Sequence, residues 1–292
     1  MKKPAAKKRA AKKSAATRPT KKPLAKFPGR LVLLGAGKMG FAMLEGWLAR
    51  GLDPRKVIVL DPKPAKAVKA LTRRGLKLNP KTPSEATVIV VAVKPQIAAD
   101  AMPMLEPYVG KSTMALSIMA GRTIAFLADA LPTGTAIVRA MPNTPASIGR
   151  GITVAVPNAR VSARQRKQAS DLLAATGGVE WVKDEALMDA VTAVSGSGPA
   201  YVFLLAEAMA QAGVTAGLPE ALAARLARDT VTGASELLHQ SKLDPSTLRQ
   251  NVTSPGGTTA AALSVLMGQD GFGRLLTEAV AAATRRSQEL AG

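Results

Sequence analysis

The feature that most constrains this chain is the stretch LVLLGAGKMG at residues 31–40. Its first four residues are apolar, as in a parallel strand covered on both faces, and Gly35, Gly37 and Gly40 follow with the spacing G-x-G-x-x-G. In such a turn the first glycine permits a tight bend, the second lets a pyrophosphate approach the backbone, and the third lets the helix pack against the strand. The helix start then presents free N–H groups to the phosphates. The stretch therefore predicts a dinucleotide site.

The flanking sequence supports this interpretation, because a glycine turn alone is common between a strand and a helix. An amphipathic segment over 39–50 is followed by Gly51, and a second apolar strand over 57–60 ends in Asp61. An acidic residue at this place normally binds the ribose hydroxyls and disfavours a 2′-phosphate. Lys63 and Lys66 follow closely and offset that charge, so NADPH and NADH both stay open as cofactors.

Further strands are expected at 87–93, 114–118 and 136–139, with helical segments between them, of which 64–74 is the first after Asp61. This alternation predicts a doubly wound α/β sheet of the Rossmann type over residues 28–184. Ligands bind such sheets beyond the carboxyl ends of the strands. The segments expected at that rim are 35–40, 61, 92–96 and 141–144, although Pro95, Pro142 and Asn143 are also ordinary strand-ending and turn residues. The expected cofactor contacts are Gly35, Ala36, Gly37, Lys38, Met39, Gly40, Asp61, Ala92, Val93, Lys94, Pro95 and Asn143.

The residue inventory narrows the chemistry. The 292 residues include no cysteine and one histidine, His239, which makes a zinc cluster or a histidine-based triad improbable. We therefore expect no metal, and expect the chemistry to come from a cofactor, backbone dipoles, hydroxyls, lysine or carboxylates. No apolar run is long enough for a membrane span, so we expect a soluble, cytoplasmic protein without membrane contact.

The formal net charge of +20 is concentrated near the N-terminus. Residues 1–27 contain eleven Lys or Arg and no acidic residue, within a Lys-, Ala- and Pro-rich sequence that has little to bury. We expect a disordered basic arm. A solvated arm is the favoured interpretation, and a weak contact with nucleic acid or another polyanion is the alternative.

From residue 185 to 292 the pattern becomes helical without a convincing strand. Helices are expected at 199–212, 219–240, 245–251, 258–267 and 272–290. The first is apolar nearly all round, with Glu207 its only charge and Gly213 as its expected stop. A helix without a polar face needs burial on every side, which a domain of this size hardly supplies. We therefore expect an all-α dimerisation domain whose first helix is buried between subunits.

A second glycine-rich stretch, VTSPGGTT at 252–259, lies between two of these helices. Its glycines, Ser254 and two threonines offer backbone N–H groups and hydroxyls at a helix start, which suits a carboxylate or phosphate. A flexible connection with an ordinary threonine N-cap is the alternative. The segment SGSGP at 195–199 also precedes a helix, and we expect it to line the same pocket.

Together, the motifs GAGKMG, VAVKPQ, MPNTP, AVSGSGPAYVF and VTSPGGTT resemble pyrroline-5-carboxylate reductases, in the order found in that family and from Gly29 to the C-terminus. The resemblance implies hydride transfer from a reduced nicotinamide to the C=N carbon of 1-pyrroline-5-carboxylate, the last step of proline synthesis. It implies a homodimer with an interlocked helical domain, or an assembly of dimers. It implies that the loop holds the substrate carboxylate and that the Thr259 hydroxyl bonds the ring nitrogen. The implied substrate contacts are Ser254, Gly256, Gly257, Thr258 and Thr259.

Two other classes share part of this pattern. A β-hydroxyacid or phosphogluconate-type dehydrogenase would carry a catalytic lysine on the helical domain, but no lysine lies between residues 184 and 240. A nucleotide-sensing dimer that binds nucleic acid through its basic arm would lose its main property when residues 1–27 are removed, whereas a reductase would keep its activity. Gln250, where the reductase family often has an acid, leaves local contacts at the loop in question.

Overall fold

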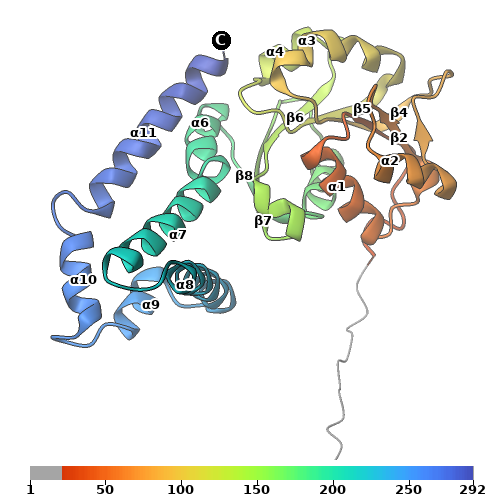
Figure 1. Ribbon diagram of the computed structural model, residues 1–292. Helices are drawn as coiled ribbons and strands as arrows, with labels where there is room; N and C mark the ends of the chain where they lie inside the picture. Colours follow the sequence, from red (N-terminus) through yellow and green to blue (C-terminus); the bar gives the residue numbers. More distant parts are fainter. Residues whose placement is uncertain (1–21, 292) are drawn as a thin grey trace, which may run out of the picture.

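The computed structural model describes residues 22–291 and contains one eight-stranded sheet with a helical domain beside it (Figure 1). The strand order is β3-β2-β1-β4-β5-β6-β7-β8, and all neighbours are parallel except β6 and β7. The strands are β1 Leu31–Leu34, β2 Val57–Leu60, β3 Lys77–Leu78, β4 Ala86–Val91, β5 Val109–Ser117, β6 Ala136–Met141, β7 Gly151–Pro157 and β8 Gly177–Trp181.

The central strands form because short apolar runs can be buried on both faces only within a sheet covered by helices. All four residues of β1 and of β2 are buried, and Leu31 pairs with Val57 on one side and Val88 on the other. Side chains of alternate residues enter two separate hydrophobic clusters, one on each face of the sheet. The helices and 3₁₀ segments of this domain are α1 Lys38–Ala49, Pro54–Lys56, α2 Lys66–Ala70, Leu71–Arg74, Pro95–Ile97, α3 Ala98–Ala101, Met102–Tyr108, α4 Ile124–Asp129, Thr144–Ile148 and α5 Ala163–Leu173.

The expected doubly wound sheet is confirmed, with one difference at its far edge. Strand β7 runs antiparallel to β6, and neither β7, α5 nor β8 was expected from the sequence. Strand β7, GITVAVP, is an uncharged run rich in β-branched residues, like β4, and is a local strand signal that the expectations did not include. Strand β8 has no buried residue and carries Glu180, so it has no such signal. Helix α5 packs against α1, where the indole Nε1 of Trp47 donates a hydrogen bond to the Leu172 carbonyl oxygen at 2.9 Å.

The folded domain begins before residue 28. Leu24 and Phe27 are 2% and 4% exposed and belong to the cluster on the α1 face. The Leu24 N–H donates to the Arg50 carbonyl oxygen at 3.1 Å, so this segment closes over the end of α1. The boundary expected after residue 27 therefore lies too late, because two apolar residues at the end of the basic segment enter the core. Residues 1–21, the rest of the expected arm, lie outside the described residues.

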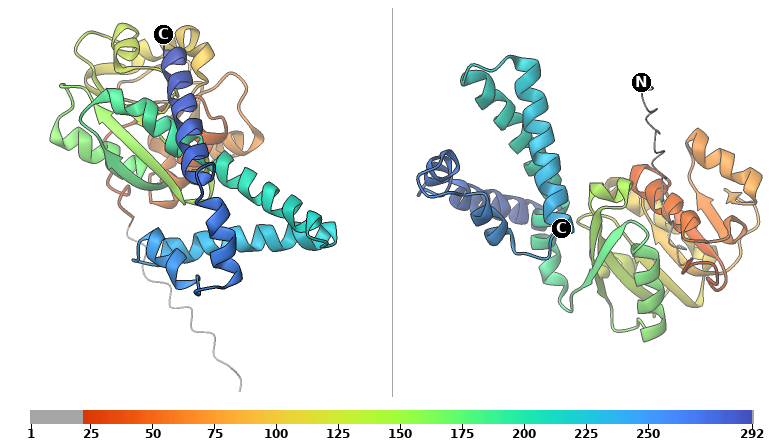
Figure 2. Two further views of the ribbon diagram at one scale, coloured as in Figure 1. Left: turned by 90° about the vertical axis from the view of Figure 1, so that its left-hand side faces the viewer. Right: turned by 90° about the horizontal axis from the view of Figure 1, so that it is seen from below.

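The second domain is helical, as expected, and extends away from the sheet (Figures 1 and 2). Helix α7 does not stop at Gly213: that residue lies inside it, close to Ala223 of α8, and the chain turns at Gly217 with φ +98°. The elements after the sheet are a 3₁₀ turn Glu185–Leu187, α6 Met188–Val191, a π-helical turn Thr192–Gly196, α7 Gly198–Thr215, α8 Glu220–Gln240, α9 Pro245–Asn251, α10 Thr258–Leu266 and α11 Phe272–Ala291.

The helical domain has little core of its own. Helix α7 has no buried residue, and Phe203 and Leu204 in its middle are 64% and 63% exposed. Val265 of α10 is 74% exposed. Isolated exposed apolar residues are normal, but a whole apolar helix surface marks a place where another molecule packs. Within residues 22–291, none of the helices has the length and apolar character that crossing a membrane requires.

Candidate active site

The glycine turn between β1 and α1 has the geometry its sequence predicts. Gly35 has φ +86°, a conformation that favours glycine, and its N–H donates to the Leu60 carbonyl oxygen of β2 at 2.9 Å. A Cβ on Gly40 would lie 2.3 Å from the Gly35 carbonyl oxygen, so any larger residue would push α1 away from the strand. These two glycines therefore hold the helix start against the rim of the sheet.

Gly37 differs from the other two because the space beside it is open. It is exposed, it precedes the first residue of α1, and no atom lies within 4 Å of the position that its Cβ would take. No side chain caps the helix there, so the first N–H groups of α1 have no acceptor within the helix. A pyrophosphate fits this place, since it supplies acceptors and negative charge at the positive end of the helix. Lys38 is exposed and Met39 half-buried at the same turn.

Asp61 lies at the end of β2, but its carboxylate is already engaged. One carboxylate oxygen accepts the Ala36 N–H at 2.9 Å, and the other accepts the Lys63 N–H at 2.8 Å. Its backbone forms two hydrogen bonds with the side chain of Asn79, which has φ +45° at the end of β3. Asp61 thus connects the glycine turn to the β2 end, while its negative charge stays at the rim. Asn79 was not among the expected site residues, although the Asn–Pro pair that it forms with Pro80 is a turn signal.

The third rim segment follows β4. Ala92 donates its N–H to the Leu34 carbonyl oxygen at 2.8 Å, which brings the residues after β4 beside the glycine turn. Val93 is half-buried and Lys94 exposed there, and the Pro95 carbonyl oxygen accepts two hydrogen bonds from the Arg122 guanidinium at 2.9 and 3.2 Å. Because β1, β2, β4 and β6 are parallel, the segments that follow these four strands lie at one end of the sheet.

Asn143 has a structural role in this chain. Its side-chain oxygen accepts the Ile152 N–H at 3.0 Å and so fixes the turn between β6 and the reversed strand β7.

The segment SGSGP lies at the π-helical turn before α7, and a Cβ on Gly196 would lie 2.5 Å from the terminal methyl of Met141 at the end of β6. The SGSGP segment therefore adjoins the rim of the sheet.

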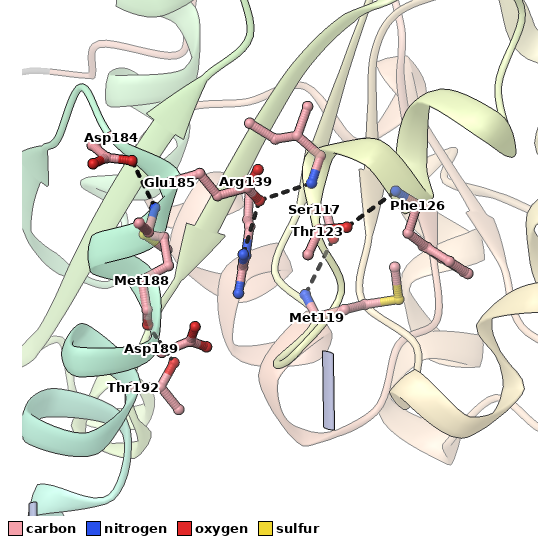
Figure 3. A network of polar contacts seen from close by, with 12 residues as sticks. Ser117, Met119, Thr123, Phe126, Arg139, Asp184, Glu185, Met188, Asp189 and Thr192 are labelled. Carbon is pink, nitrogen blue, oxygen red and sulfur yellow. Dashed lines mark hydrogen bonds and ion pairs between the residues drawn. The ribbon is translucent and has the colours of Figure 1, made fainter. Parts of the chain in front are cut away.

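An ion pair between a buried arginine and a half-buried glutamate connects the rim to the start of the helical domain (Figure 3). The Arg139 guanidinium, on β6 and 4% exposed as a residue, donates to Glu185 Oε1 at 2.8 Å. The same oxygen accepts the Ile124 N–H at the start of α4, also at 2.8 Å. Nearby, Asp189 of α6 accepts a hydrogen bond from the Ser287 hydroxyl of α11 at 2.7 Å. The sequence signal for this pair is an arginine inside the apolar strand AIVRAM, which needs a partner when buried.

The VTSPGGTT loop forms the exposed start of α10. Gly256 has φ +70°, and Gly257 precedes the helix without a side-chain cap, so the first N–H groups of α10 have no acceptor within the helix. Ser254 and Thr258 are exposed, and Thr259 is half-buried. Among the described residues, no hydrogen bond engages the hydroxyl of Thr259, whereas the Thr253 hydroxyl donates to the Arg249 carbonyl oxygen at 2.7 Å. The loop is therefore able to receive a carboxylate.

Within one chain the loop and the rim are far apart. The loop between α9 and α10 lies at the end of the helical domain that points away from the sheet, in all three views (Figures 1 and 2). The structure thus brings together the expected cofactor residues but does not bring the expected substrate residues to them. The SGSGP segment adjoins the rim and lies apart from the loop of its own chain, so the expectation that both line one pocket stays a prediction for the assembled protein.

A cavity of about 1500 Å³ separates the sheet edge from α7 and α8. Residues 148–151 line one side and Phe203 the other, and Arg150 forms an exposed ion pair with Glu236 at 3.2 Å across it. The Gln240 amide and, more weakly, the Arg150 guanidinium lower the pKa of Glu236 below its ordinary value. Neither the glycine turn nor the loop lines this cavity, so it is not the site of the chemistry in a single chain.

The fold and the rim define a dinucleotide-dependent oxidoreductase with a helical second domain. Within the described part of the chain, no group of three or more metal-ligating side chains is present. Comparisons with known proteins specify this class. Residues 185–290 match the family described as pyrroline-5-carboxylate reductase dimerisation, and residues 30–121 match the family described as NADP oxidoreductase, coenzyme F420-dependent.

Relatives match nearly the whole chain. A pyrroline-5-carboxylate reductase of Pseudomonas aeruginosa is 40% identical over 265 residues, covering 90% of this chain and 97% of the relative. One from Synechocystis is also 40% identical over 265 residues, covering 89% of this chain and 98% of the relative. The solved structure of a pyrroline-5-carboxylate reductase from Coxiella burnetii aligns with a TM-score of 0.81 and 32% identity, covering 90% of this chain and 99% of that one. The chain belongs to the pyrroline-5-carboxylate reductase family.

Proposed function

We propose that this protein reduces the C=N bond of 1-pyrroline-5-carboxylate to give L-proline, with NADPH or NADH as hydride donor. The observation that carries the proposal is the combination of an open dinucleotide cradle at Gly37 with an uncapped, hydroxyl-lined helix start at residues 254–259 in a member of this family. A related Plasmodium falciparum reductase structure has NADP bound, with a TM-score of 0.74 and 29% identity, covering 91% of this chain and 99% of that one.

The bound cofactor supplies the hydride. The chain's own contribution at the rim is binding and orientation: the α1 start receives the pyrophosphate beside Gly37, and Gly35 and Gly40 keep that helix close to the strands. The residues after β4, from Ala92 to Pro95, lie beside this turn, along the path of the nicotinamide half toward the β6 end. Asn143 supports this path through its bond to Ile152, and its role is to position the turn.

The loop anchors the substrate. The N–H groups at the start of α10, with the Ser254 and Thr258 hydroxyls, bind the substrate carboxylate, and the free hydroxyl of Thr259 bonds the ring nitrogen. A protonated imine is already a good hydride acceptor and can take its proton from water. Orientation is therefore the main requirement, and aligned reactants can gain about 7–11 kcal/mol from it. No histidine is needed, in agreement with the single, exposed His239.

We further propose that the complete site forms between two copies of the chain. The loop lies away from the rim of its own chain (Figure 2), and the apolar residues Val202, Phe203 and Leu204 of α7 are exposed in one chain. A second copy can cover that surface and bring its loop to the first copy's rim. The number of dimers in a larger assembly, and the cytoplasmic location expected from the sequence, stay predictions.

A single substitution tests the substrate role. In Thr259→Ala the hydroxyl that bonds the ring nitrogen is lost, so kcat for pyrroline-5-carboxylate falls by about tenfold or more, from a hydrogen bond to a charged group of about 1.5–3 kcal/mol. The dissociation constant for NADPH stays unchanged. The matched control is Ser264→Ala, farther along the same helix, which keeps full turnover. Turnover is followed by loss of reduced-nicotinamide absorbance. Full turnover in Thr259→Ala would remove this residue from the mechanism.

Mixing two defective proteins tests the shared site. Gly37→Ala disables the cofactor rim and Thr259→Ala the loop, so each protein alone has low activity. If each site uses the rim of one copy and the loop of the other, a mixed dimer carries one doubly defective site and one intact site. Unfolding and refolding the equimolar mixture then restores about a quarter of wild-type activity, because about half of randomly assembled dimers are mixed. No recovery from a mixture shown to contain mixed dimers would place both parts of the site in one chain.

A further inference from the structure

The net charge of this protein resides entirely in its first 81 residues. Residues 1–81 contain 23 Lys or Arg and three acidic residues, whereas residues 82–292 contain 17 of each. Within the described residues 22–81 alone, 14 basic residues stand against Glu45, Asp53 and Asp61. The excess is therefore not confined to the N-terminal arm. It extends over the folded edge of the sheet formed by β1, β2 and β3, together with α1 and α2.

Many of these basic residues gather at the amino ends of the strands. Arg30 directly precedes β1, Lys56 directly precedes β2, and Arg73 and Arg74 end the 3₁₀ segment before β3. Because the three strands are parallel, their amino ends meet at one edge of the sheet, opposite the cofactor rim. We call the surface formed by Lys22, Lys26, Arg30, Lys56, Arg73 and Arg74 the basic end.

Local contacts connect the parts of this surface. The Lys56 ammonium donates to the Phe27 carbonyl oxygen, which brings the segment with Lys22 and Lys26 to the start of β2. A Cβ on Gly75, which follows Arg74, would lie 2.5 Å from Cγ of Arg55, so the two 3₁₀ segments that precede β2 and β3 touch. Lys22 lies against Gly51 at the end of α1. The basic end is therefore one continuous surface.

Neighbouring carboxylates neutralise little of it. Asp53 accepts hydrogen bonds from Nε and Nη2 of Arg55 at 3.0 and 2.7 Å, and this guanidinium lowers the pKa of Asp53 to about 2. That pair is close to neutral, so Arg55 is not part of the basic end. Glu85 also lies at this edge, where it lines a cleft with Arg30 and Lys56. Even with Glu85 included, the basic end keeps a clear positive excess.

The surface chemistry distinguishes between classes of polyanion. Among the described residues 22–81 no large apolar side chain is exposed, whereas membrane-surface segments insert such side chains between lipids. No aromatic side chain is exposed there either, and single-stranded nucleic acid is held largely by stacking on aromatic rings. Lysine and arginine alone suit the regularly spaced phosphates of a duplex, whose binding is independent of sequence.

Residues 1–21, which precede Lys22 in the sequence, contain nine Lys or Arg and no acidic residue. We propose that the basic end forms a sequence-independent binding surface for double-stranded DNA, separate from the reductase site at the opposite edge of the sheet. The protein then binds DNA and its cofactor at the same time.

The test measures binding of the full chain to a fluorescent 25-base-pair duplex by anisotropy. If about six phosphates are contacted, raising the salt from 50 to 200 mM weakens binding by about 10³-fold. Saturating NADPH leaves the affinity within about twofold, because the two sites lie at opposite edges. Loss of binding in the presence of NADPH, or an affinity independent of salt, would overturn the proposal.

Charge reversal locates the surface. Arg73→Glu/Arg74→Glu changes two exposed residues of the basic end and lowers DNA affinity at 100 mM salt by about tenfold or more, with a smaller salt slope. The matched control, Lys183→Glu/Lys242→Glu, makes the same change in charge at exposed positions outside this edge and changes affinity by about twofold or less. Removal of residues 1–21 also weakens binding. Equal effects of the two double variants, or an effect of the deletion alone, would show that the basic end is not the site.

Vesicles test the alternative partner. Vesicles containing 30% phosphatidylserine carry comparable negative charge, and we expect them to compete poorly with the duplex at equal phosphate concentration. Displacement of the duplex by these vesicles at equal phosphate would assign the surface to a membrane instead.

All variants are compared at equal NADPH-binding capacity, which confirms that the sheet is folded. A failure of DNA binding is therefore distinguishable from a failure of the reductase.

Discussion

Replacing Gly37 by alanine separates cofactor binding from folding. Gly37 has φ −66° and ψ −168°, which any residue adopts, and nothing lies within 4 Å of the new methyl group. The loss of unfolded-state entropy stabilises the variant by about 0.4–1 kcal/mol. Alanine is a poorer N-cap than glycine by an amount of similar size, up to about 1 kcal/mol. The two effects oppose each other, so the free energy of unfolding changes by less than about 1 kcal/mol.

Cofactor binding changes much more in the same variant. The new methyl group occupies the space through which a pyrophosphate approaches the first N–H groups of α1. Loss of one hydrogen bond to a charged phosphate costs about 1.5–3 kcal/mol, which corresponds to about a 10- to 150-fold higher dissociation constant. Calorimetric titration with NADPH measures this constant, and urea unfolding of the same preparation measures stability.

Gly40→Ala is the contrasting variant. Its Cβ would lie 2.3 Å from the Gly35 carbonyl oxygen and 3.1 Å from Cβ of Ala92, so α1 must move away from the sheet. Such overpacking lowers the free energy of unfolding by about 1–3 kcal/mol, together with cofactor affinity. Unchanged NADPH affinity in Gly37→Ala, or a loss of stability in it as large as in Gly40→Ala, would refute the reasoning.

Two other substitutions test the surroundings of the site. Glu185→Ala leaves the buried Arg139 without its counter-charge and lowers the free energy of unfolding by about 3 kcal/mol, measured by urea unfolding; a loss below about 1 kcal/mol would show that water replaces the carboxylate. Asp61→Asn removes the negative charge at the ribose end of the rim, so the ratio of kcat/KM for NADPH to that for NADH rises, and a constant ratio would show that this charge does not reach the 2′-position.

The first half of the sheet was predictable because its signals are local. The strands at 31–34 and 57–60 form at the expected residues, since a short apolar run between turn residues has few other ways to be buried. Strand β7 has such a run, whereas β8 lacks one, and the places of both strands in the sheet depend on contacts between residues distant in sequence. The reversal at β7 depends in part on one hydrogen bond, from the Ile152 N–H to Asn143, which no periodicity reveals.

The candidate site was predictable in its parts and not in its arrangement. The glycine spacing indicates which residues approach the cofactor because each glycine is needed for a local reason. The hydrogen-bond partners of Asp61 could not be predicted, since they depend on how the ends of β2 and β3 meet at Asn79. The distance between the 254–259 loop and the rim is likewise a property of the packing of whole helices, which motif order along the chain does not encode.

The remote loop and the exposed face of α7 have one common physical explanation. Burial of a large apolar side chain contributes about 1.5–3 kcal/mol, and α7 alone leaves Phe203 and Leu204 largely in water and Val202 partly in water. A domain with so few buried residues gains most of its stability from a partner, as obligate dimers do. The same association can carry a loop to the rim that one chain cannot reach. If the active site forms between two copies, as proposed, then folding of the helical domain, dimerisation and completion of the site are a single coupled event, and we expect dilution that separates the copies to remove reductase activity and helical stability together.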